Sequence, residues 1–151
     1  MASNSRLTIA VHTLGILAFQ NEAPINSKLI AESVGTNPVV IRRIVGNLAK
    51  HGLVEVKMGT GGGAKLTRAP ENIRIGEIYL ALEEDEIFNV PEFNETHCCQ
   101  LGRLVRPVLG EILDDAEKYL IAKLNEVSLL DVMKKVGEKL PKDFCVRKSN
   151  G

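Results

Sequence analysis

The sequence predicts a mainly α-helical protein with a small β-hairpin: a winged helix-turn-helix followed by a long C-terminal dimerisation helix. Three observations lead to this fold class. Apolar residues recur at helical spacing through residues 5–51 and again through 101–124, as in helices with one buried face. A glycine-containing turn separates two short helical segments. A short β-prone run with a glycine-rich loop follows the second segment, which is typical of a wing.

The composition favours a compact protein with an aliphatic core. Of 151 residues, 44% are hydrophobic but only 4% are aromatic, and there is no tryptophan. No apolar run approaches the about 20 residues that a membrane-spanning helix needs. The N-terminus also lacks the basic-then-apolar layout of a secretion signal. We therefore expect a cytoplasmic protein without membrane contact, whose three cysteines remain thiols.

The first two helices are predicted from their caps and their apolar spacing. The first starts from Ser5 as its N-cap and runs to about Phe19. The second covers residues 28–34, and either Asn26 or Ser27 can cap it. A turn containing a glycine then ends the second helix.

A third helix restarts sharply after this turn. Asn37 can cap it, and Pro38 fits the first helical turn, where its missing N–H group costs nothing. The helix is expected to run to about His51 and to stop at Gly52. Its predicted buried stripe consists of Ile41, Ile44, Val45 and Leu48.

The hairpin is predicted where the apolar period changes. Residues 53–57 and 64–67 read as strands on either side of a glycine-rich loop over 59–63. This loop joins two strands and lacks the Gly-Lys-Ser/Thr ending of a nucleotide-binding loop, which argues against a nucleotide site. Lys57 and Lys65 flank the loop, which suits a wing that touches DNA backbone or minor groove.

These elements divide the chain into four parts. Residues 1–82 are predicted to form the winged helix-turn-helix DNA-binding domain, ending in a short helix from Ile73 to Leu82. Residues 83–100 form an acidic connector, residues 101–140 the dimerisation helices, and residues 141–151 a tail.

The long helix carries an apolar stripe that the rest of its own lobe is too small to cover. We expect this stripe to pack against a second copy of the chain, although folding back on the first helix remains open. Pro107 either sits in its first turn or kinks it. Ser128 and Asp131 resemble a capping box that opens a last helix to about Val136. The predicted dimerisation residues are Leu104, Val105, Val108, Ile112, Ala116, Tyr119 and Leu120.

The formal net charge of zero hides an asymmetry between the two halves. Residues 1–76 carry nine Lys or Arg against four Asp or Glu, and residues 77–151 carry ten against fifteen. A basic first half suggests that this half meets a polyanion, although a merely solvated surface would look similar.

The third helix is the candidate for reading double-stranded DNA. Opposite its buried stripe lie Val39, Arg43, Gly46 and Lys50, flanked by Arg42 and Asn47. Arginine reads guanine edges, asparagine reads adenine, and lysine meets phosphate. A solvated amphipathic helix is the alternative. The predicted DNA contacts are Ser27, Lys28, Asn37, Val39, Arg42, Arg43, Asn47, Lys50, Lys57 and Lys65.

The tripeptide His97-Cys98-Cys99 precedes the long helix. A thiol beside histidine and before a helix start can react with oxidants, so Cys98 and Cys99 are redox-sensing candidates, with packed thiols as the alternative. Adjacent cysteines do not easily chelate one metal ion, and Cys145 is distant, so we expect no metal, iron–sulfur cluster or other cofactor. A cysteine-dependent enzyme is less favoured, because nothing supplies an oxyanion hole. A winged-helix module that binds proteins instead of DNA stays open.

Together these residues resemble the Rrf family of bacterial winged-helix transcription regulators. Three stretches carry the resemblance in order: SKLIAESVGTNPVVIRRIVGNLAKHGLVEVKMGTGGGAKLTR, IRIGEIYLALE and CQLGRLVRPVLGEILDDAEKYLIAKLNEVSLLDV. The resemblance implies a homodimeric regulator, usually a repressor. Residues 37–51 would be its recognition helix and residues 57–65 its wing. The helix starting near Leu104 would cross its partner.

Two departures from the family pattern bear on the site. Met58 and Ala64 stand where the family's wing often has Arg-Gly and Tyr, so the minor-groove arginine is missing and Lys57 or Lys65 would replace it. Only Cys99, with its neighbour, occupies one of the three cysteine places of the cluster-binding members. The resemblance therefore implies the clusterless branch, whose signal is a thiol reaction, a small molecule or a protein.

Overall fold

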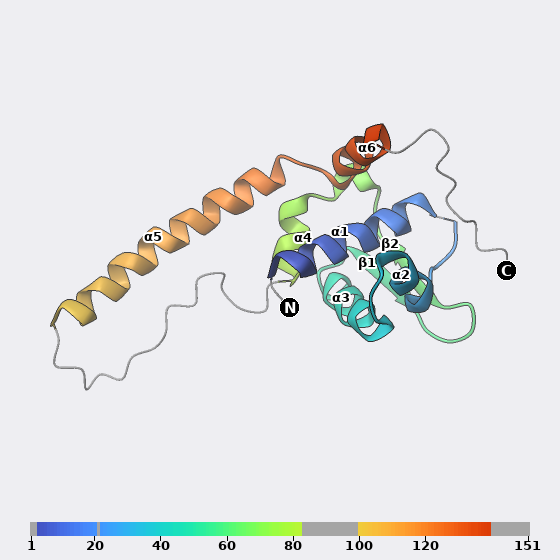
Figure 1. Cartoon of the computed structure of the whole chain (residues 1–151), viewed down its shortest axis with the longest axis horizontal. Coiled ribbons are helices and arrows are strands. Elements are labelled where there is room, and N and C mark those ends of the chain that lie inside the picture. Colours follow the sequence, from blue (N-terminus) through green and yellow to red (C-terminus); the bar gives the residue numbers. More distant parts are fainter. Residues whose placement is uncertain (1–2, 21, 83–99, 140–151) are drawn as a thin grey trace.

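The computed structural model describes residues 3–20, 22–82 and 100–139. Within these residues the chain forms six α-helices and one two-stranded hairpin, so the mainly α fold class is confirmed. Figure 1 shows α5 extending away from a body that the other elements form together (Figure 1). The elements are α1 (Ser3–Phe19), α2 (Ser27–Val34), α3 (Pro38–Lys50), β1 (Val54–Lys57), β2 (Gly63–Leu66), the 3-10 helix η1 (Pro70–Asn72), α4 (Ile75–Leu82), α5 (Gln100–Asn125) and α6 (Leu129–Lys139).

The helix-turn-helix is held by its caps. The Asn26 side chain accepts a hydrogen bond from the Leu29 N–H at 3.0 Å, so Asn26 is the N-cap of α2 and Ser27 is its first residue. Gly35 ends α2 in the left-handed conformation, at φ 75°. Asn37 then accepts from the Val39 N–H at 2.8 Å and starts α3, as predicted. The prediction for α1 is wrong at its start, because Ser5 lies inside a helix that already includes Ser3.

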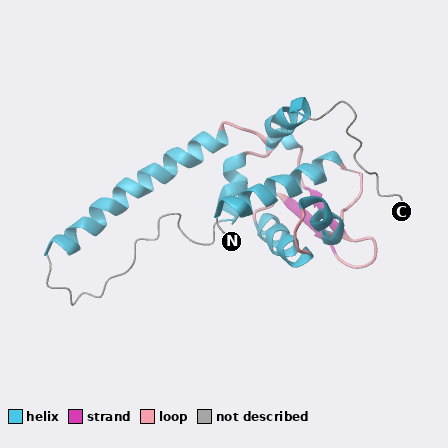
Figure 2. Ribbon diagram, viewed as in Figure 1, coloured by secondary structure: helices cyan, strands magenta, loops and turns pink. Residues whose placement is uncertain are grey.

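The hairpin is tied, near its loop, to the segment before α2. β1 and β2 pair antiparallel, with Val54 opposite Leu66 and Val56 opposite Ala64. Ile25 adds a bridge to Ala64, with N–H to carbonyl distances of 2.9 Å in both directions. A side chain at Gly63 would collide with this bridge, because a Cβ atom there would lie 2.4 Å from the Ile25 carbonyl. The wing is therefore anchored at the start of β2, next to its loop. The two strands are magenta in Figure 2, and β2 begins one residue earlier than predicted.

The core is aliphatic and lies between α1, α2, α3, α4 and the hairpin. The predicted stripe of α3 is buried as expected, and it meets fully buried leucines of α1. The short helix predicted from Ile73 begins instead at Ile75, after the 3-10 turn of η1. The largest fully buried side chains include Leu14, Leu17, Ile30, Ile41, Ile44, Leu48, Leu53, Ile73, Ile78, Leu82 and Leu129.

The C-terminal end of α5 is fastened to the body. Gly76 lets α5 approach α4, because a Cβ atom on Gly76 would lie 2.2 Å from Asn125 Oδ1 and 3.0 Å from the Ile121 carbonyl oxygen. After α5, the Ile75 N–H donates to the Val127 carbonyl at 3.0 Å. The remainder of α5 projects into solvent, and Pro107 lies inside this helix (Figure 1).

α6 begins with the predicted capping box. The Asp131 N–H donates to Ser128 Oγ at 3.1 Å, and the Ser128 N–H donates back to Asp131 Oδ2 at 2.9 Å. The Ser128 hydroxyl also donates to Asp131 Oδ2 at 2.7 Å. This hydrogen bond and, after it, that of the Ser128 N–H lower the pKa of Asp131. The helix runs to Lys139, three residues further than predicted.

Candidate nucleic-acid interface

The exposed face of α3 gathers cations around an apolar residue. Arg42, Arg43 and Lys50 are exposed, and Val39 is 60% exposed at the start of the helix. Gly46 lies between them, and a Cβ atom on it would have no heavy atom within 4 Å. A helix face with a flat, glycine-containing centre and cations at its edges suits the width and charge of a DNA major groove.

Asn47 is the exception among the residues predicted on this face. It is only 6% exposed and packs into the body below α3. The prediction that Asn47 flanks the solvent-facing side of the helix is therefore wrong. Position 47 is three residues after buried Ile44 and next to buried Leu48, so it lies at the edge of the face that α3 turns to the core.

The start of α2 lies beside α3 and joins its cationic face. Arg42 Nη1 lies 3.5 Å from Ser27 Oγ, a long contact between residues fifteen positions apart. Lys28 follows at an exposed position. The side-chain oxygen of Asn37, Oδ1, accepts the capping hydrogen bond, which leaves the side-chain NH₂ group as the donor for an external acceptor. The structure thus brings Ser27, Arg42 and the starts of both helices to one side.

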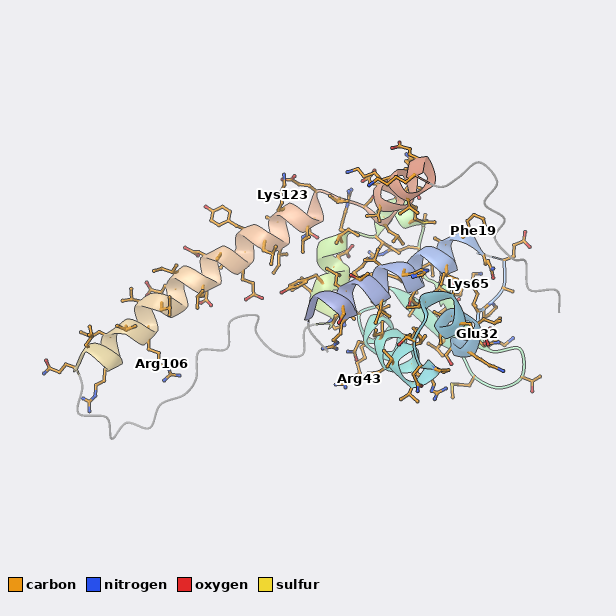
Figure 3. The ribbon with its side chains drawn as sticks, in the orientation of Figure 1. Phe19, Glu32, Arg43, Lys65, Arg106 and Lys123 are labelled. Carbon is orange, nitrogen blue, oxygen red and sulfur yellow. The ribbon has the colours of Figure 1, made fainter. Side chains whose placement is uncertain are left out.

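The wing presents its two lysines differently. Lys57 is exposed at the end of β1. Lys65 is half-buried on β2, at the position opposite Glu55 of β1. In Figure 3, Lys65 lies near Phe19 at the end of α1, away from Arg43 (Figure 3). Lys57 is therefore the better candidate of the two.

Met58 is a feature of the wing that the sequence analysis named only as a departure from a family pattern. It follows Lys57 and is 85% exposed. The alternation of apolar residues at positions 54, 56 and 58, which continues one residue past the end of β1, could have identified it as part of the apolar face of the hairpin. It lines a cleft beside α3.

Arg68 does not belong to the cationic face. Its Nη2 lies 2.6 Å from Glu77 Oε1, and the Arg74 N–H donates to the other carboxylate oxygen at 2.8 Å. Burial by itself would raise the pKa of Glu77, but these hydrogen bonds outweigh it and lower the pKa. This pair fastens the end of the hairpin to α4.

The long helix carries the most exposed apolar surface among the described residues. No side chain of α5 is buried. The predicted dimerisation residues lie along it in the exposed state, with Leu104 64% and Tyr119 79% exposed. Leu109, which the prediction did not include, is exposed as well. A contiguous apolar surface of this kind on a soluble protein marks an interaction site.

The predicted redox residues, Cys98 and Cys99, lie outside the described residues, as does Cys145. Within 3–20, 22–82 and 100–139, no group of three or more His, Cys, Asp or Glu side chains is placed to hold a metal ion. No helix in these ranges is long and apolar enough to cross a membrane.

Comparisons with known proteins agree with this geometry. A family model described as Rrf2, iron-dependent transcriptional regulator, matches residues 3–135. The HTH-type transcriptional regulator YwnA of Bacillus subtilis is 34% identical over 131 residues, which cover 86% of this chain and 96% of YwnA. NsrR of the same organism is 32% identical over 72% of this chain and 73% of its own. The solved structure of CymR, the global cysteine regulator of B. subtilis, is 25% identical and covers 88% of this chain and 93% of its own, with a TM-score of 0.55.

Proposed function

The chain belongs to the Rrf2 family of DNA-binding transcriptional regulators, and from this premise we propose that it acts as a homodimer that represses transcription. In this proposal residues 1–82 hold α3 in the major groove, and residues 101–140 join the two copies. The observation that carries the proposal is the combination of a cationic α3 face with an α5 whose apolar stripe from Leu101 to Leu120 stays exposed in the single chain.

The DNA contacts in the proposal come from three neighbouring elements. Arg42 and Arg43 read base edges, with Val39 available for a thymine methyl group. Lys50 and Lys57 meet phosphates on either side of the groove, and Lys65 adds a weaker contact. Ser27, Lys28 and the Asn37 amide contact the backbone where α2 and α3 begin. Asn47 is left out because its side chain is buried.

In the proposal, a second copy of the chain covers the apolar stripe of α5. The apolar side chains from Leu101 to Leu120 follow one another at three- and four-residue steps, over a helix of about 39 Å. A C2 pair of such helices buries the same patch on both chains. It also holds two α3 helices at a fixed separation, and a dimeric regulator needs this separation to engage successive major grooves about 34–36 Å apart.

The signal in the proposal reaches the dimer where the connector meets α5. Cys98 and Cys99 immediately precede α5 in the sequence, so a modification there would act on the element that sets the separation of the two lobes. We assign no step to iron. Replacing Cys98 and Cys99 with Ser, singly and together, should remove the sensitivity of DNA binding to hydrogen peroxide or hypochlorite. Oxidant sensitivity that persists in the double variant would rule out both thiols.

The experiment that tests the whole proposal combines mass and binding. Sedimentation at micromolar concentration should give twice the mass of the chain. Fragments selected from genomic DNA should bind with a strong salt dependence, because phosphate contacts release counterions. A monomer that binds no DNA fragment at low salt would contradict the proposal.

A further inference from the structure

A cleft of about 350 Å³ lies between the start of α2, α3 and the wing. This volume is at the lower end of the range of small-molecule sites, about 300–1,000 Å³. The cleft is too small for a helix of a partner protein. Nothing in the proposed DNA contacts requires a hollow at this place.

Glycines line the cleft on two sides. Gly46 faces it from α3, where a Cβ atom would have no heavy atom within 4 Å. Gly62 and Gly63 face it from the wing, and they cannot carry side chains because the backbone of Lys57 and Ile25 lies too close. The hydrogen bonds between Ile25 and Ala64 hold the wing in this position. The hollow is therefore a built feature of the hairpin anchorage.

The walls are apolar, and the charges are of one sign. Buried Ile25, Ile30 and Val45 form the apolar wall, and half-exposed Val56 continues it on the wing. Among the described residues, the charged ones that line the cleft are Arg42 and Lys57, and none that lines it is acidic. The Ser27 hydroxyl lies 3.5 Å from the Arg42 guanidinium. A ligand that matches this distribution has an apolar body and an anionic head.

We propose that this cleft binds a small carboxylic acid with an apolar body, and that the bound acid competes with DNA. The carboxylate pairs with Arg42, with Lys57 and Ser27 as further partners, while the aliphatic or aromatic body contacts Val45 and Val56. The competition part rests on the proposed function, because Arg42 and Lys57 belong to its DNA contacts. A cation that pairs with the acid is no longer available to contact DNA, so the bound acid lowers the affinity for DNA. By thermodynamic linkage, bound DNA lowers the affinity for the acid by the same factor.

The binding test uses hexanoate and phenylacetate, with hexanamide and phenylacetamide as neutral controls and acetate as the anion without a body. Heteronuclear NMR should show saturating shifts at the amides of Gly46, Val56 and Gly63 with the two acids at millimolar concentration. The amides and acetate should give shifts at least several-fold smaller. Equal shifts with acetate would mean that the site attracts any anion and does not recognise the apolar part of the acid, which would contradict the proposal. The absence of a saturating shift with both acids would overturn the proposal.

Two variants separate the cleft from general effects. Gly46→Leu should abolish the shifts, because its side chain fills the hollow. Gly137→Leu is the matched control, since a Cβ atom there also has open space, on exposed α6 away from the cleft. The Arg42→Gln variant should still bind the apolar part of the ligand weakly, but it should lose the preference for the acids over the amides. Retention of that preference in Arg42→Gln, or of the shifts in a folded Gly46→Leu, would contradict the assignment.

The competition test uses a fluorescein-labelled mixed-sequence duplex at low ionic strength. Saturating hexanoate should lower DNA affinity at least about threefold, and hexanamide should leave it unchanged. Unchanged DNA affinity with a filled cleft would overturn the regulatory part alone. If the protein binds no DNA when no acid is present, that result would count against the proposed function and leave the assignment of the cleft unaffected.

Discussion

The body and the long helix of this protein satisfy their apolar residues in opposite ways. In the body, residues from α1, α2, α3, α4 and the hairpin bury one another completely. α5 is folded over 26 residues, yet no side chain on it is buried. The body therefore has a core of its own, whereas the apolar stripe of α5 stays exposed among the described residues, which is typical of an interaction surface.

The cations follow the same division. Those on α3 and β1 surround a flat surface of the body, and Arg68 is fastened to Glu77 at the edge of the hairpin. The two regions thus expose two different surfaces, a cationic one on the body and an apolar one on α5. In the proposed function the first meets DNA and the second meets another copy of the chain.

The largest effect should come from the same truncation made in both regions. Leu48→Ala should lower the free energy of unfolding by about 2–5 kcal/mol, because Leu48 is fully buried and the change leaves a cavity. Leu104→Ala should cost little in dilute protein, where its exposed side chain has no partner. Chemical denaturation at several protein concentrations would measure both. A large, concentration-independent loss in Leu104→Ala would break the comparison.

The next effect concerns what covers α5. Ile112→Asp places a charge in the apolar stripe and should shift the protein from dimer to monomer, weakening association at least about 100-fold. Gly110→Asp is the matched control, because position 110 lies about 160° around the helix from Ile112 and has open space for a side chain. Sedimentation equilibrium would compare them. An Ile112→Asp variant that remains dimeric would place the interface elsewhere.

A smaller effect is expected on the cationic surface. Arg43→Ala should weaken specific DNA binding about tenfold or more at fixed salt, since one arginine–guanine pair contributes about 1–3 kcal/mol of discrimination. Arg68→Ala removes the same charge from the residue paired with Glu77 and should change DNA affinity far less. Fluorescence anisotropy with a selected DNA fragment distinguishes them. Equal losses would mean that only overall charge matters.

The smallest effect lies at the joint that carries α6. Ser128→Ala removes an N-cap and should cost about 1 kcal/mol at neutral pH. Because the pKa of Asp131 is lowered in the fold, its ionised form stabilises the protein above its unfolded pKa of about 4. This contribution disappears as the pH falls through the lowered pKa. Thermal melts from pH 7 to pH 3 should show a narrowing difference in Tm between the wild type and the variant. A constant difference would mean that the Asp131 carboxylate does not contribute to the cap.

The local signals of the sequence predicted most helix boundaries of the body. Asn37 and the Ser128–Asp131 pair were identified as caps, and Asn26 was one of two candidates, since a capping side chain bonds to a backbone group two or three residues away. The buried stripe of α3 was predicted for the same reason, because helical periodicity is a property of the helix alone. Ser5 failed because a serine can also stand inside a helix, and nothing local distinguishes the two places.

The tertiary structure decided what each exposed or buried position meets. Asn47 is polar and periodicity placed it near the surface, but the layer beneath α3 covers it. Arg68 looks like any other basic residue of the first half until α4 brings Glu77 to it. The glycines at 63 and 76 read as loop and helix residues, yet their close neighbours are Ile25 and Asn125, which lie far along the chain. The sequence by itself determines the helices and their apolar faces, because those depend on neighbours within a few residues. The cationic surface, the cleft beside it and the fastening of α5 depend on which distant segments pack together, and only the folded chain decides that.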